Sequence, residues 1–267
     1  MTDAVRTPHQ HSDGPENAPA LLLGPSLGTS LDIWEPHVPA LAGQYRVLRY
    51  DLPGHGSSAT GLLPRPEPGL TTVADLAALV IALADSRRLR TFHYAGISLG
   101  GAVGTYLAVH HPERVASLAL ICTSAHFGPA EPWHERAALV REQGTGPLVS
   151  TAPARWFADP LTATGPRGAA LLRDLAQADP TGYAACCDAL AALDLRPDLS
   201  RITTPTLVVS GARDVAAPVE HGRELAAGIG DSTLEVVDAG HLAGTERPDE
   251  VTALLLGHLQ LWSIPTP

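Results

Sequence analysis

The sequence lacks lysine completely. Its 18 basic residues are all arginine and stand against 28 acidic residues, which gives a formal net charge of −10. A chain of this sign repels nucleic-acid phosphates, so we expect no nucleic-acid partner. Charged residues make up only 17% of the chain and hydrophobic residues 45%. This composition is that of a globular protein and excludes disorder as its main character.

Cysteine is also scarce, with only Cys122, Cys186 and Cys187 in 267 residues. Two of these are sequence neighbours, so the three cannot build a disulfide framework. A reducing compartment fits this pattern, and we predict a cytoplasmic location. Residues 1–18 contain no apolar run of signal-peptide length, and no later stretch is long enough to span a bilayer. We therefore expect no membrane association.

Short apolar runs bounded by turn residues recur along the chain and are typical of buried strands. Helical periodicity lies between them, for example in residues 76–83 behind a capping box of Thr72 and Asp75, and in residues 251–259 behind Pro248. This alternation predicts an α/β protein with a mostly parallel sheet and helices on both faces. The expected strands are Ala20–Leu23, Tyr45–Tyr50, Phe92–Ala95, Val115–Cys122, Thr206–Val209 and Leu234–Val237.

One interval interrupts the alternation, because no strand pattern appears between Cys122 and Thr206. Residues 124–200 contain alanine-rich helical stretches separated by proline and glycine. We interpret this segment, the helical insertion, as a lid inserted into a core of residues 1–123 and 201–267. We also expect the first dozen residues and residues 264–267 to be poorly ordered ends.

The strongest motif is Gly96-Ile97-Ser98-Leu99-Gly100-Gly101, which follows one expected strand and precedes a helical run. A G-x-S-x-G pattern alone is weak and also fits an ordinary glycine-rich turn. In a strand-turn-helix context it predicts a nucleophile elbow, in which a strained turn exposes the Ser98 hydroxyl. Ser98 is therefore our candidate nucleophile.

A serine nucleophile needs a base, and that base needs an orienting acid. Asp214 and His241 each follow an expected strand, so both would lie at the carboxyl edge of the sheet with Ser98. Taken singly, Asp214 could be a simple turn residue and His241 is one of 12 histidines. The chain order Ser, Asp, His is nevertheless that of α/β-hydrolases, which predicts a catalytic triad.

An acyl-transfer site also needs N–H donors for the oxyanion. The N–H of Leu99, directly after the nucleophile, is the first candidate. The second should come from the loop after the first core strand, where Pro25 has no N–H to offer. We predict Ser26 for this role, with Leu27 as the alternative.

Several further runs add to the elbow. They are Gly24–Ser30 with Trp34, Val47–Gly56, Phe127–Pro129 with Trp133, Arg155–Phe157 and Cys187–Leu190. Together they resemble the 3-oxoadipate enol-lactonases, α/β-hydrolases of bacterial protocatechuate and catechol breakdown. The likeness extends from residue 13 over nearly the whole chain. The N-terminus shows little strand alternation, so one opening antiparallel strand of the family is expected to be missing or frayed.

The resemblance implies a small-molecule lactone substrate with a free carboxylate, and no cofactor or metal. An anion approaching a chain of charge −10 needs a local cation, for which Arg136 and Arg155 are candidates. Trp34, Trp133 and Trp156 are candidates for the pocket wall. The alternatives are solvated lid residues for the arginines and core packing for the tryptophans.

Two other functions remain open from the residues alone. The same triad could act on neutral esters, as in a carboxylesterase or a perhydrolase-type relative. A hydrolase fold can also lose its chemistry and serve as a ligand-binding protein. The presence of Ser98, Asp214 and His241 together favours an enzyme.

Overall fold

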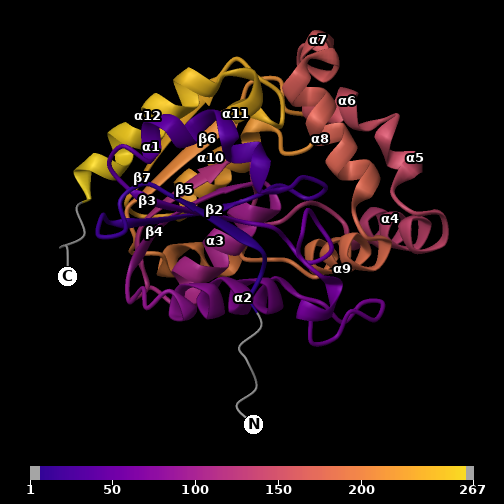
Figure 1. Cartoon of the computed structure of the whole chain (residues 1–267), viewed down its shortest axis with the longest axis horizontal. Coiled ribbons are helices and arrows are strands. Elements are labelled where there is room, and N and C mark those ends of the chain that lie inside the picture. Colours follow the sequence, from indigo (N-terminus) through magenta and orange to yellow (C-terminus); the bar gives the residue numbers. More distant parts are fainter. Residues whose placement is uncertain (1–6, 263–267) are drawn as a thin grey trace.

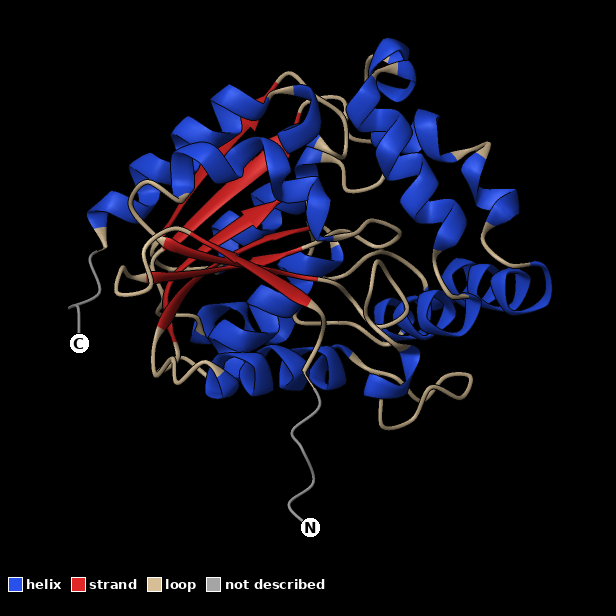
Figure 2. Ribbon diagram, viewed as in Figure 1, coloured by secondary structure: helices blue, strands red, loops and turns tan. Residues whose placement is uncertain are grey.

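The computed structural model describes residues 7–262, and within them the chain forms a seven-stranded sheet flanked by helices (Figures 1 and 2). The strand order is β1-β3-β2-β4-β5-β6-β7, and every neighbouring pair is parallel except β1 with β3. The strands are β1 (Gln10–Asp13), β2 (Ala20–Gly24), β3 (Arg46–Tyr50), β4 (Phe92–Ile97), β5 (Val115–Ile121), β6 (Thr206–Gly211) and β7 (Ser232–Val237).

Helices cover both faces of the sheet, as expected for a parallel sheet. One layer contains the 3₁₀ helix η1 (Leu31–His37) with α1 (Val38–Leu41), α11 (Ala243–Glu246) and α12 (Pro248–Leu261). The other contains α2 (Val73–Ser86), α3 (Leu99–His110) and α10 (Val219–Gly228). Two short 3₁₀ helices, η2 (Thr60–Leu62) and η3 (Arg196–Arg201), lie in connections. No helix between residues 7 and 262 has the length and apolarity to cross a membrane.

All six expected strands are confirmed, with boundaries that differ by at most two residues. The physical reason is their composition, since β2, β4 and β6 are buried along their whole length and read as continuous apolar runs. The expected starts of α2 and α12 are also confirmed. The Asp75 carboxylate accepts the Thr72 N–H at 2.8 Å, and Pro248 begins α12.

The expectation of a poorly ordered start is wrong for part of that segment, because β1 pairs antiparallel with β3. Its residues show no apolar alternation, so periodicity could not reveal it. Ladder hydrogen bonds hold it, together with the ring of His9, whose Nδ1 lies 2.7 Å from Oδ2 of the buried Asp51. The predictions for residues 1–6 and 264–267 lie outside the described residues.

The helical insertion occupies the connection between β5 and β6, and its elements stand beside the sheet in Figure 1. Within the insertion, α4 packs against α9, and an ion pair between Arg141 and the buried Asp188 joins the two helices. Its role as a lid stays a prediction. The elements are α4 (Ala130–Gln143), α5 (Gly146–Val149), α6 (Ala152–Trp156), α7 (Pro160–Thr164), α8 (Pro166–Gln177) and α9 (Pro180–Ala191).

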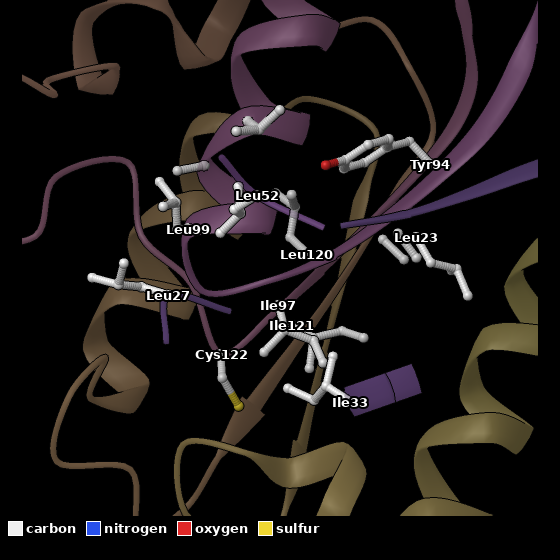
Figure 3. Packing of buried hydrophobic residues seen from close by; sticks show 14 of the residues in the cluster. Leu23, Leu27, Ile33, Leu52, Tyr94, Ile97, Leu99, Leu120, Ile121 and Cys122 are labelled. Carbon is white, nitrogen blue, oxygen red and sulfur yellow. The ribbon is translucent and has the colours of Figure 1, made fainter. Parts of the chain in front are cut away.

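Figure 3 shows the part of the apolar core that lies around the carboxyl ends of the central strands. Ile97 and Ile121, the last residues of β4 and β5, are fully buried there. Tyr94 is buried in the same cluster, and its hydroxyl donates a hydrogen bond of 3.0 Å to the carbonyl of Gly100 in α3. The core therefore holds the turn between β4 and α3 in place.

Gly96 provides a test of how tightly this turn is packed. A Cβ at Gly96 would lie 2.3 Å from the backbone carbonyl carbon of Gly100, so Gly96→Ala forces the main chain apart. We expect the free energy of unfolding, measured by urea denaturation, to fall by at least about 2 kcal/mol.

The control is Gly257→Ala, because Gly257 lies within α12 with open space around it. This substitution should raise the free energy of unfolding by about 0.5 to 1 kcal/mol through helix propensity. Equal effects of the two alanines would contradict the close packing inferred at Gly96.

Candidate active site

Ser98 lies in the turn between β4 and α3 with φ 54° and ψ −117°. A positive φ is strained for a residue with a Cβ, so this conformation persists only because its neighbours hold it. The Ser98 N–H donates to the carbonyl of Ile121 at 3.0 Å, and the Thr123 hydroxyl donates to the Ser98 carbonyl at 2.6 Å. The turn has the strand-turn-helix geometry expected of a nucleophile elbow.

The loop after β2 lies directly against this turn. The Gly100 N–H donates to the carbonyl of Pro25 at 3.1 Å, and a Cβ at Gly100 would lie 2.4 Å from the carbonyl oxygen of Gly24. Glycine is required at position 100 because two main chains meet there. The contact places Ser26, which is buried, beside Ser98.

Asp214 and His241 form a hydrogen-bonded pair at the same edge of the sheet. Nδ1 of His241 lies 2.9 Å from Oδ2 of Asp214, and both side chains are almost completely buried. The other oxygen of Asp214 accepts the N–H groups of Ala216 at 2.7 Å and Ala217 at 2.9 Å. These bonds stabilise the carboxylate and orient the imidazole.

Ser98 and His241 line the same pocket, so the sequence-predicted residues converge. Across residues 7–262, no hydrogen bond joins the Ser98 hydroxyl to the His241 ring. Catalytic hydrogen bonds commonly tighten only when a substrate is bound. The arrangement can support nucleophilic attack by a serine whose base is oriented by a carboxylate.

Two N–H groups are available near Ser98. Leu99 is the first residue of α3, where backbone N–H groups have no partner within the helix. The Ser26 N–H likewise has no acceptor in the described part of the chain. Ser26 and Leu27 both line the pocket, so the loop can place a donor opposite that of Leu99.

Arg136 of α4 and Arg155 of α6 both line the pocket and lie close enough to affect each other. Burial and the neighbouring Arg136 guanidinium lower the pKa of Arg155 from its usual value. Within residues 7–262 neither arginine has a carboxylate partner, and Arg136 instead stacks on Trp133, with its Cζ 4.9 Å from the ring centroid. Two partly buried cations that have no carboxylate partner are chemically suited to an anionic ligand.

The other predicted pocket residues divide into two groups. Trp133 and Trp156 line the pocket, whereas Trp34 does not. Trp34 is fully buried in η1, and its indole N–H donates to the carbonyl of Gly24 at 3.2 Å. The structure thus places Trp34 in the core, beneath the loop that carries Ser26.

Sequence reasoning did not assign Phe127 and Tyr183 to the pocket, yet both line it. Burial raises the pKa of Tyr183 well above its usual value, and the guanidiniums of Arg136 and Arg155 oppose that shift. The hydroxyl is therefore a neutral donor near the two cations. Helical periodicity marks Tyr183 only as a buried helix residue, so no sequence signal identified it as a pocket residue.

The chain belongs to the alpha/beta hydrolase family, whose model matches residues 21–254. The expected fold class and the expectation of a hydrolytic enzyme are confirmed. Two relatives from Acinetobacter baylyi (strain ATCC 33305 / BD413 / ADP1) are 3-oxoadipate enol-lactonase 2 and 3-oxoadipate enol-lactonase 1. The first is 41% identical over 88% of this chain and 86% of its own length, and the second 33% identical over 93% and 91%.

A solved structure supports the same relationship. The enol-lactonase from Burkholderia xenovorans LB400 superposes with a TM-score of 0.89 and 37% identity, over 94% of this chain and 96% of its own. The resemblance to the enol-lactonases expected from the loop and insertion residues is therefore confirmed.

The three cysteine thiols are the other possible nucleophiles besides Ser98, and their pKa values decide whether they are reactive. Burial raises the pKa of the Cys122 and Cys186 thiols far above their usual range and that of Cys187 to about 12. The reactive thiolate form is therefore nearly absent at pH 8.

We expect a disulfide reagent to label no thiol of the native protein at pH 8 and all three in guanidinium chloride. Rapid labelling of a thiol in the native protein, with loss of activity, would contradict the assignment of Ser98 as the nucleophile.

Proposed function

We propose that this protein hydrolyses 3-oxoadipate enol-lactone to 3-oxoadipate through a covalent acyl-enzyme on Ser98. The observation that carries this proposal is a pair of cations, Arg136 and Arg155, that have no carboxylate partner among residues 7–262 and lie in the same pocket as Ser98 and His241. This arrangement suits an ester bond in a molecule with a free carboxylate. The names of the two Acinetobacter relatives supply the particular lactone.

Acylation begins when the Ser98 hydroxyl attacks the lactone carbonyl and transfers its proton to Nε2 of His241. Rotation of the Ser98 side chain within the pocket forms the hydrogen bond needed for this transfer. The Asp214 carboxylate, 2.9 Å from Nδ1, stabilises the resulting imidazolium. The N–H groups of Leu99 and Ser26 donate to the oxyanion, with Leu27 as the alternative second donor.

Collapse of the tetrahedral intermediate breaks the ring C–O bond, and an enolate leaves the carbonyl carbon. It remains attached to the acyl chain and takes at carbon the proton that His241 received from Ser98, which gives the ketone and returns the imidazole to its neutral form. Water then attacks the acyl-enzyme, His241 takes its proton, and Ser98 recovers a proton as the ester bond breaks. The product has one more carboxylate than the lactone, and both guanidiniums can pair with it.

The position of the cations explains how an acidic protein binds an anion. The formal net charge of −10 repels the substrate at long range, so the attraction has to come from groups close to the reaction centre. Arg136 and Arg155 belong to the helical insertion, whereas Ser98 and His241 belong to loops at the sheet edge. The insertion therefore supplies specificity and the sheet edge supplies the chemistry.

Removal of the nucleophile tests the chemical part of this proposal. Ser98→Ala should lower kcat for the enol-lactone by roughly 10⁴ to 10⁶-fold, because the acyl-enzyme cannot form. The loss of the lactone ultraviolet band measures the rate, and thermal unfolding checks that the variant is folded. Near-normal turnover by folded Ser98→Ala would refute the assignment.

Removal of a cation separates this function from its closest rival, a hydrolase of neutral esters. Arg155→Met should raise KM for the enol-lactone by about 10 to 100-fold, because a charge-assisted pair is lost, and change KM for a neutral aryl ester less than about twofold. Arg223→Met, on the exposed face of α10, is the matched control. An equal change for both substrates would favour the neutral-ester hydrolase.

A further inference from the structure

Glu246 is a carboxylate outside the pocket that the proposed mechanism does not use. It is the last residue of α11, five positions after His241. Its Oε2 accepts the Gly240 N–H at 2.6 Å and the Ala158 N–H at 3.2 Å. Its Oε1 accepts the Asp159 N–H at 2.9 Å. One side chain thus joins the loop that carries His241 to a segment of the insertion more than 80 residues away in sequence.

The two segments are also packed main chain against main chain. A Cβ at Gly240 would lie 2.7 Å from the Ala158 nitrogen and 3.0 Å from the Trp156 carbonyl oxygen. The Leu242 N–H donates to that same carbonyl at 2.9 Å. Hydrogen bonds therefore flank His241 on both sides and lead to the chain directly after Arg155.

We propose that Glu246 is a positioning residue that sets the place of Arg155 relative to His241. Arg155 and Trp156 end α6 and line the pocket, and the next three residues contain the two N–H groups held by Glu246. The inference rests on the proposed function, in which Arg155 binds the substrate carboxylate. Glu246 then fixes the distance between the anion-binding group and the base that acts on the ester.

The chemistry of the contact requires a carboxylate. A carboxylate offers only acceptors, and its two oxygens can serve three N–H donors at once. Glutamine replaces one oxygen by an NH₂ group, which would face an N–H donor. Glu246 makes no ion pair with the described residues, so its charge is directed at these amides alone.

The test compares Glu246→Gln with a matched control, Glu250→Gln, in the exposed first turn of α12. For Glu246→Gln we expect KM for the enol-lactone to rise about tenfold, the effect of losing one well-placed charged contact, while KM for a neutral aryl ester changes less than about twofold. Glu246→Asp, which keeps both oxygens on a shorter side chain, should recover part of the loss. Glu250→Gln should match the unmodified protein on both substrates.

The double variant Glu246→Gln/Arg155→Met separates positioning from general damage. If Glu246 acts through Arg155, the double variant has no higher KM for the lactone than Arg155→Met alone. Additive increases in KM, or equal losses on both substrates, would overturn the positioning role. An unchanged lactone KM in Glu246→Gln, where Arg155→Met raises it, would also overturn that role and leave the proposed function intact.

Hydrogen exchange provides an arm that does not depend on the substrate. In Glu246→Gln the amides of residues 158, 159 and 240 should exchange faster, whereas those of β4 and β5 should be unchanged. Unaltered exchange at these three amides would overturn the inference, even if Arg155→Met left the lactone KM unchanged and so refuted the proposed function.

Discussion

The candidate site depends on the close main-chain packing around Ser98. At Gly96 and Gly100 a Cβ would clash with neighbouring backbone. The close main-chain packing at these two glycines holds Ser98 at a positive φ. The same packing brings the loop after β2 against the start of α3, so that two N–H groups lie near one hydroxyl. The apolar ends of β4 and β5 support this turn from the core. Fold stability and the proposed chemistry therefore rest on the same few atoms.

Charge distribution explains how the two halves of the site cooperate. The sheet edge provides a buried Asp214–His241 pair whose carboxylate accepts two backbone N–H groups, whereas the insertion provides two guanidiniums that have no carboxylate partner among residues 7–262. A buried cation is costly until an anion neutralises it, so the proposed anionic substrate would complete the electrostatics of the pocket. Glu246 spans the boundary between the two halves, because it binds backbone on both sides.

The sequence predicts most of the fold because β2, β4 and β6 are buried along their whole length and read as apolar runs. It fails for β1, which a ladder and the His9–Asp51 contact hold without any apolar pattern. The position of Ser98, Asp214 and His241 directly after expected strands is enough to predict that they lie at one edge of the sheet. The sequence does not show that Trp34 belongs to the core and Tyr183 to the pocket, because these positions depend on how the insertion packs against the sheet edge. The hydrogen-bond partners of Glu246 could not be predicted from the sequence either, because they are backbone N–H groups, which every residue type except proline has.

The proposed function requires a serine that is activated by His241 and lies in a pocket that binds anions. The most direct measurement is the rate at which a fluorophosphonate labels the protein, with the site located by peptide mass spectrometry, in the presence and absence of adipate. We predict that Ser98 carries the label and that adipate, a dicarboxylate able to pair with Arg136 and Arg155, slows labelling. Labelling at another residue, or a rate at Ser98 that adipate leaves unchanged, would contradict the proposed function.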